Sequence, residues 1–139
     1  MEVQVNLLAV VLAMVASMVV GMVWYAKPVF GTRWMKLTNM NDKKAKEGST
    51  KAIGLTIVVS LVTAYVLAHA TYLSNSFFAN SFLQDALTTA FWMWLGFVAA
   101  RIITHDAFEQ RPTELTVMNV VHEFVTLMAM GLVIGLIAV

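Results

Sequence analysis

Four long stretches of almost uninterrupted apolar residues set what this chain can fold into. They cover roughly residues 5–26, 52–73, 84–104 and 114–139. A helix needs about 20 mostly apolar residues to cross the hydrocarbon core of a bilayer, and each stretch is long enough. Inside lipid the backbone must satisfy its own hydrogen bonds, which a helix does within one segment. The sequence therefore predicts an all-α integral membrane protein, a four-transmembrane-helix bundle with one domain over 1–139.

The composition agrees with a membrane protein and narrows its chemistry. Of the 139 residues, 60% are hydrophobic and 12% are charged, whereas soluble domains have about a quarter charged residues. A soluble domain of this size could not bury so much apolar surface. The chain has no cysteine, which excludes disulfides, iron–sulfur clusters and thiolate zinc sites. We expect no metal and no cofactor, and we expect no nucleic-acid partner.

The basic residues predict how the spans are oriented. All nine Lys and Arg residues lie in or beside two connections, 27–51 and 105–113, whereas the connection 74–83 and both ends of the chain have none. Basic residues concentrate in cytoplasmic loops. We therefore expect the lipid bilayer as the first partner, both connections in the cytoplasm and both termini outside. Because the positive charge follows the first apolar stretch, we expect that stretch to stay in the membrane and not to be removed as a secretory leader.

The basic loop 27–51 contains one segment with two interpretations. The run NDKKAKEG, from Asn41 to Gly48, has a capping residue at its start and a glycine at its end. It predicts either a short surface helix or a solvated linker that follows anionic lipid.

Small residues recur at every fourth position in each span. Such ridges let helices approach closely in lipid, where no hydrophobic force drives their association. The positions are Ala9, Ala13, Ser17 and Gly21, then Ser60, Ala64 and Ala68, then Gly96, Ala100 and Thr104, then Gly131 and Gly135. We expect a compact bundle in which the last glycine pair faces another helix or another subunit. Because this pair could join two subunits, we also expect the protein to form a homo-oligomer.

The fourth span carries polar groups where lipid makes them costly. At about 100° per residue, Asn119, His122, Glu123 and Thr126 share one stripe of this helix. We expect the stripe to face the interior of the bundle. An ionised carboxylate at this depth needs a cationic partner or a proton.

Arg101 is the partner that the sequence offers to this stripe. Folding the chain back through the turn 105–113 sets Arg101 at the depth of the stripe, with Trp94 and Phe97 on its own face. An arginine stays charged and binds carboxylates with a planar fork. We therefore predict a polar intramembrane network of Arg101, Asn119, His122, Glu123 and Thr126.

Two interpretations of this network stay open. In the first, the network fixes the pairing of the last two spans. In the second, it has a function: it binds a small ligand, or its carboxylate and imidazole load a proton. The alternative function is a small proton-coupled transporter or channel that uses Glu123 and His122. We find no nucleophile–base pair and no phosphate loop in the sequence, so we do not expect an enzyme.

Two further polar clusters have weaker patterns. The first cluster could form an outer ligand site or anchor the second span at the membrane surface; it comprises Tyr65, His69, Tyr72 and Asp85. The second cluster has carboxylate–imidazole spacing in the turn 105–113 or is solvated surface; it comprises His105, Asp106 and Glu109.

Three segments carry a resemblance to a known family. They are GMVWYAKPVFGTRWM (21–35), WLGFVA (94–99) and AFEQRPTELTVMNVVHEFVTLMAMGLVIGL (107–136). Over nearly its whole length the chain resembles a bacterial four-helix membrane family catalogued as domain of unknown function 1761. The resemblance implies a four-helix fold in a bacterial cytoplasmic membrane and brings no established activity.

The resemblance also implies which positions matter. It picks out Gly21, Trp24, Tyr25, Pro28, Phe30, Gly31, Trp34, Gly96, Phe97, Asn119 and His122. The family tends to have a tyrosine before the histidine, where this chain has Val121, and Glu123 lies outside the pattern. By this resemblance His122 is a stronger site candidate than Glu123.

Overall fold

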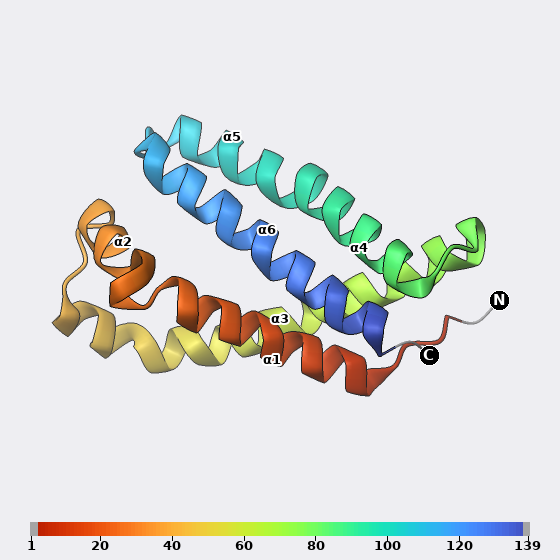
Figure 1. The fold of residues 1–139 in the computed structure, drawn as a ribbon. Coiled ribbons are helices and arrows are strands. Elements are labelled where there is room, and N and C mark those ends of the chain that lie inside the picture. Colours follow the sequence, from red (N-terminus) through yellow and green to blue (C-terminus); the bar gives the residue numbers. More distant parts are fainter. Residues whose placement is uncertain (1–2, 138–139) are drawn as a thin grey trace.

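The computed structural model describes residues 3–137, and every regular element in that range is a helix (Figure 1). In chain order the elements are α1 (Leu7–Trp24), η1 (Lys27–Gly31), α2 (Thr32–Leu37), α3 (Asp42–Phe78), α4 (Phe82–Met93), η2 (Trp94–Ala99), α5 (Ala100–Phe108) and α6 (Thr113–Leu136). The short elements η1 and η2 are π-helical, with a wider turn than an α-helix. Because α4, η2 and α5 follow each other without a break, they form one rod.

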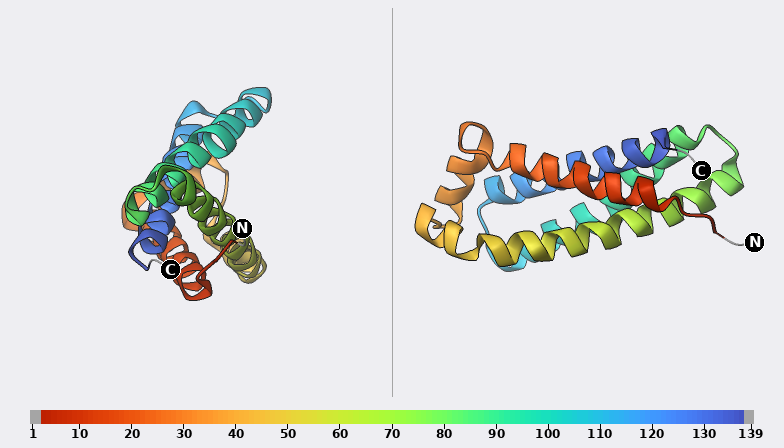
Figure 2. Two further views of the ribbon diagram at one scale, coloured as in Figure 1. Left: turned by 90° about the vertical axis from the view of Figure 1, so that its right-hand side faces the viewer. Right: turned by 90° about the horizontal axis from the view of Figure 1, so that it is seen from below.

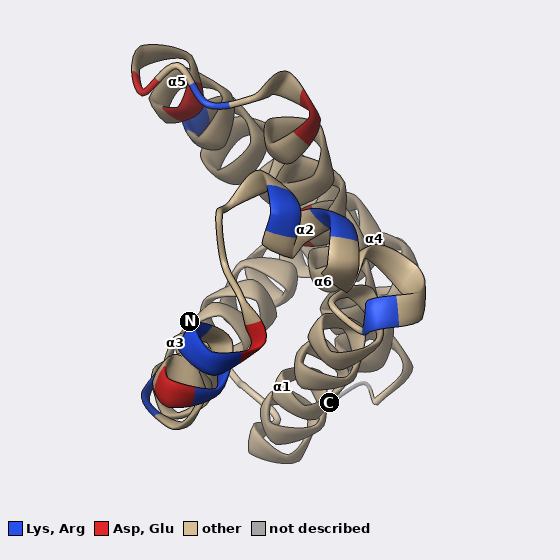
Figure 3. Cartoon of the chain, turned by 90° about the vertical axis from the view of Figure 1, so that its left-hand side faces the viewer, with Lys and Arg blue, Asp and Glu red and all other residues tan. Residues whose placement is uncertain are grey.

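The four long rods confirm the predicted number of apolar helices. Each of α1, α3, α4–α5 and α6 is long and apolar enough to cross a membrane. The start of α1 and the end of α6 lie at one end of the bundle, and α2 lies at the other (Figure 1). Figure 3 looks onto the α2 end and shows Lys and Arg on α2, on the start of α3 and at the turn between α5 and α6. We call this the basic end; the side of the membrane it faces stays a prediction.

Helix α3 is longer than the sequence patterns indicated. The side chain of Asn41 accepts a hydrogen bond from the Lys44 backbone N–H at 2.9 Å, as predicted for a helix start. The helix does not end at Gly48 and runs on to Phe78 over 37 residues. One interior glycine costs about 1 kcal/mol, too little to stop a helix between good helix formers. At ~1.5 Å per residue the helix is roughly 55 Å long, so it extends beyond the ~30 Å hydrocarbon core.

Both short turns are held by a buried carboxylate. Between α3 and α4, Asp85 accepts hydrogen bonds from the side chains of Asn75 at 2.8 Å and Asn80 at 3.0 Å. Between α5 and α6, Asp106 accepts one from the Thr116 hydroxyl at 2.7 Å. Each carboxylate therefore has a structural role, while His105 and Glu109 beside Asp106 are exposed. Asp85 is therefore part of the turn and not of an outer ligand site. In the same predicted cluster, the ring centroid of His69 lies 6.3 Å from that of Tyr65.

The small-residue ridges predicted for α1 and α3 are buried except at Gly21, which is partly exposed. Ala9, Ala13 and Ser17 on α1 and Ser60, Ala64 and Ala68 on α3 all lie in the interior. The ridge predicted for the third span is wrong. Gly96, Ala100 and Thr104 are exposed, and Ala86, Ala90 and Ala99 face inward instead.

The π-helix η2 explains why the third ridge was misplaced. Along this rod Ala86, Ala90 and Trp94 follow an α-helical repeat of four residues, and the next buried residue is Ala99, five positions later. A π-helical turn holds one extra residue and rotates everything after it. A ridge predicted by counting α-helical turns across η2 therefore lies on the wrong face of α5.

The glycine pair of α6 packs within the same chain. A Cβ atom on Gly131 would lie 2.9 Å from the Ala90 Cβ, and one on Gly135 would lie 2.8 Å from the Leu83 Cα. Both glycines therefore let α6 touch the backbone of α4, the intramolecular member of the two predicted alternatives. Self-association stays a prediction, and these glycines no longer motivate it.

The bundle is closed at one end and open at the other. The most deeply buried large side chains, Leu67, Met130 and Ile134, lie in the half near the termini. Toward the basic end α3 and α5 diverge on opposite sides of the α1–α6 pair (Figures 2 and 3). Residues 51–59 of α3 are accordingly all exposed, and so is most of α5.

Ion pairs between exposed side chains join the parts of the basic end. Arg33 on α2 forms a two-pronged ion pair with Glu114 at the start of α6, which raises the pKa of the Arg33 guanidinium. Lys27 pairs with Asp42 at 2.9 Å, across the connection from α1 to α3. Such exposed pairs contribute little to stability. The pair of Arg33 with Glu114 positions α2 over the start of α6.

Two alanine substitutions of glycine should have opposite effects on stability. Gly135→Ala forces α6 away from α4 and should lower the free energy of unfolding by about 1–3 kcal/mol. Gly54→Ala on α3 meets no atom within 4 Å and should leave the free energy unchanged or raise it by up to ~1 kcal/mol through better helix propensity. Denaturant titration of both purified variants in the same detergent measures the difference. Equal stabilities would contradict the close contact between α4 and α6.

Candidate functional site

The open half of the bundle contains a cavity of about 610 Å³ between α1, α3 and α6. Pockets that hold drug-sized molecules have volumes of about 300–1,000 Å³. Apolar side chains form most of the wall, and polar groups from all three helices interrupt it. These polar lining residues are Ser17, Tyr25, Thr56, Ser60, Thr63, His122, Glu123 and Thr126.

The hydroxyl groups on the α3 wall follow helical spacing. Thr56, Ser60 and Thr63 recur after four and three residues, so they lie on one face of α3. Only Ser60 was singled out by the sequence, and as a packing residue. The spacing of the two threonines around it is the signal that could have identified this wall.

His122 and Glu123 lie side by side at the α6 wall and form an ion pair when the imidazole is protonated. The Nδ1 atom of His122 lies 3.3 Å from the Oε1 atom of Glu123, and their side chains are 13% and 38% exposed. The other ring nitrogen, Nε2, faces α1 at Gly21, where an added Cβ would lie 3.9 Å from it. Any larger side chain at this position of α1 would take up the space in front of Nε2.

Aromatic rings from the end of α1 surround the imidazole. The ring centroids of Tyr25 and Trp24 lie 5.0 Å and 5.8 Å from that of His122. Phe30 packs on Trp24 at 4.5 Å, and Trp34 packs edge-on against Tyr25 at 5.5 Å. Four aromatic residues that the family resemblance picked out therefore assemble beside His122.

Gly31 and Pro28 bring the chain back onto these rings. Pro28 lies in the first turn of η1, where its missing N–H needs no partner. A Cβ atom on Gly31 would lie 2.2 Å from the backbone oxygen of Tyr25, so no other residue fits this turn. The Gly31 N–H closes the turn by donating to the Ala26 oxygen at 3.0 Å.

Three buried polar atoms near His122 lack hydrogen-bond partners within the described residues. They are Trp24 Nε1, His122 Nε2 and Thr126 Oγ1, and the last two belong to residues that line the cavity. The fourth such atom, the Thr71 hydroxyl, lies on α3 outside the lining. A buried polar group without a partner costs about 1–3 kcal/mol. Two of the four atoms, His122 Nε2 and Thr126 Oγ1, therefore belong to the wall of one cavity.

The predicted network is smaller in the structure than in the sequence analysis. His122, Glu123 and Thr126 meet at the cavity, but Arg101 is exposed on α5, and in residues 3–137 neither its side chain nor that of Asn119 makes a hydrogen bond or ion pair. Folding back through the turn gave the correct depth for Arg101. It could not give the direction, because η2 rotates α5 away from α6.

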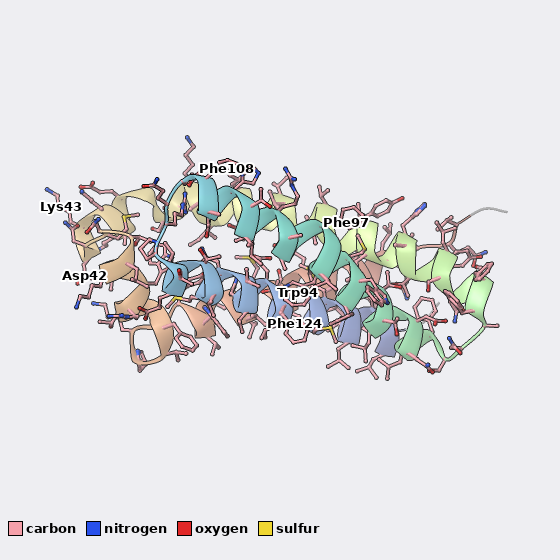
Figure 4. The ribbon with its side chains drawn as sticks, turned by 90° about the horizontal axis from the view of Figure 1, so that it is seen from above. Asp42, Lys43, Trp94, Phe97, Phe108 and Phe124 are labelled. Atoms are coloured by element: carbon pink, nitrogen blue, oxygen red, sulfur yellow. The ribbon has the colours of Figure 1, made fainter. Side chains whose placement is uncertain are left out.

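The residues expected to cover Arg101 have other roles. Trp94 lies between the rods, where its ring packs on Phe124 at 4.8 Å and its Nε1 donates to the Val120 oxygen at 3.0 Å (Figure 4). Phe97 points outward and is 75% exposed (Figure 4). Trp94 thus anchors η2 to α6, two residues before His122.

Comparison with known proteins identifies a family and nothing more specific. No curated protein and no solved structure matches the chain. Across the described part of the chain, no three His, Asp or Glu side chains are grouped so that they could hold a metal ion. The sequence model of the family described as protein of unknown function (DUF1761) matches residues 8–135, and the chain therefore belongs to this family.

Proposed function

We propose that this protein binds a small amphipathic molecule inside the membrane, in the cavity between α1, α3 and α6. The observation that carries the proposal is the cavity of about 610 Å³ in which the buried His122 Nε2 and Thr126 Oγ1 atoms lack partners. A site with apolar walls and a few convergent polar groups is the usual form of a small-molecule site.

The lining supports an amphipathic ligand. Met18, Met22 and Met130 are flexible and polarisable and adapt to an irregular apolar chain. The ionisable groups His122 and Glu123 lie together on α6 and suit one polar head group. A purely polar solute would leave the apolar walls without contacts.

We propose binding and not catalysis. No Ser or Thr hydroxyl in the described lining donates a hydrogen bond to His122 or Glu123. A nucleophile needs a base within hydrogen-bond reach to be activated.

A proton-coupled transporter or channel is the second candidate function. One observation favours it: the carboxylate and the imidazole that line the cavity are paired at 3.3 Å in the middle of a span. Intramembrane ionisable groups of this kind mark ion and substrate pathways.

Filling the cavity from the α3 wall should abolish binding. Val59 lines the cavity and Val58 does not, although both are exposed valines on the same helix. Saturable binding of the apolar dye diphenylhexatriene should be seen with wild-type protein in lipid nanodiscs after subtraction of empty nanodiscs. Val59→Trp should lose it, because the indole occupies the cavity, and Val58→Trp should keep it. Absence of saturable binding by the wild type, or equal loss in both variants, would contradict the proposed site.

Proton flux tests the second candidate. In proteoliposomes loaded with the pH dye pyranine, a potassium gradient and valinomycin drive protons through any conducting protein. The wild type should acidify the lumen faster than protein-free vesicles, and Glu123→Gln should return to the protein-free rate because it removes the titrating carboxylate. Glu47→Gln, on the exposed start of α3, is the control and should match the wild type. Equal rates for the wild type and Glu123→Gln would exclude this role.

A further inference from the structure

We infer that the head group of the bound molecule is a cation, an amine or quaternary ammonium group held against Glu123. This inference rests on the proposed function and specifies its ligand class. It starts from the charges that line the cavity. Among residues 3–137, Glu123 is the only acidic residue of the lining, and no Lys or Arg of that range lines the cavity.

No basic side chain on a neighbouring helix neutralises Glu123. The one basic group beside it among the described residues is the imidazole of His122, which carries a charge only when it is protonated, and Arg101 is exposed on α5. The Glu123 side chain is 38% exposed. Inside a membrane a carboxylate without a cation stays ionised only at high cost. A cationic ligand in the cavity supplies the missing charge.

The pairing of His122 with Glu123 also favours a hydrogen-bond donor. A neutral imidazole has one N–H and one acceptor nitrogen. When the neutral imidazole carries its proton on Nδ1, which faces the Glu123 carboxylate at 3.3 Å, the buried Nε2 is an acceptor without a partner within the described residues. A protonated amine provides N–H donors for the carboxylate and for Nε2.

Aromatic and thioether groups complete the surroundings of a cation. Tyr25 lines the cavity beside His122, and Met18 and Met22 lie on the same helix. Aromatic faces attract ammonium groups, and thioethers are polarisable. An anionic head group would instead face the carboxylate without a counter-cation, and a neutral one would leave it uncompensated.

A matched pair of dyes tests the charge of the head group. Diphenylhexatriene and its trimethylammonium derivative have the same apolar body and differ in one cationic group. Saturable binding of each dye is measured by fluorescence anisotropy in nanodiscs of zwitterionic lipid, with empty nanodiscs subtracted. The wild type should bind the cationic dye about tenfold more tightly than the neutral one, the size of effect expected for a partly desolvated cation.

The same experiment uses two charge-removing variants. Glu123→Gln should weaken binding of the cationic dye about tenfold and change binding of the neutral dye by less than about twofold. Glu47→Gln removes an exposed carboxylate outside the lining and should change neither. The thermal unfolding temperature of each variant shows whether it is folded, and the preference of the wild type between the two dyes does not depend on any variant.

The outcomes separate the inference from the proposed function. Equal affinity of the wild type for both dyes, or an unchanged affinity of folded Glu123→Gln for the cationic dye, would overturn the cationic head group and leave a binding cavity. Saturable binding of neither dye would overturn both. A cation preference that is lost equally in Glu47→Gln would show a surface charge effect and would also overturn the inference.

Discussion

The contact between α6 and α4 is the interaction on which the rest of the structure depends. Gly131 and Gly135 bring the two backbones together in the half near the termini. In lipid such close approach replaces the hydrophobic force that drives packing in water. With α6 fixed there, α1 and α3 close around the same half and bury Leu67 and Ile134. In the other half, α5 and α6 are joined by the hydrogen bond between Thr116 and Asp106, and most of α5 is exposed. A bundle tight at one end and open at the other follows from these two features.

The open half has an energetic cost that a rigid structural role does not explain. A cavity loses the dispersion contacts of its walls, and unpartnered polar atoms lose hydrogen bonds. The structure places both at the same spot, beside His122 and Thr126. Stable cores avoid such sites, whereas binding sites tolerate them because the ligand fills the space and completes the bonds. This coincidence separates the site from Asp85 and Asp106, whose carboxylates have partners within the chain.

The sequence predicted those parts of the fold that depend on composition or on local periodicity within one helix. Apolar length gave the four rods, the spacing of Ala9 and Ala13 gave a buried face, and Asn41 gave a helix start. It failed where two helices must be placed relative to each other. Arg101 was expected at Glu123 because depth can be counted along a chain, but direction depends on a π-helical turn that no residue pattern announced. The cavity was also missed, because its only local mark, the hydroxyl spacing of Thr56, Ser60 and Thr63 on α3, does not show which helices enclose the space.

Val121 illustrates how the fold can supply by packing what the local sequence lacks. This chain has valine directly before His122, where the family pattern tends to have tyrosine. In the structure the Val121 side chain is exposed and does not line the cavity. Tyr25, at the end of α1, stands beside the imidazole instead, with the ring centroids 5.0 Å apart. This aromatic contact is formed between helices, next to the turn at Gly31 that packs Phe30 onto Trp24. The aromatic block of α1 and the histidine of α6 thus make one site, although they lie about 100 residues apart in the sequence.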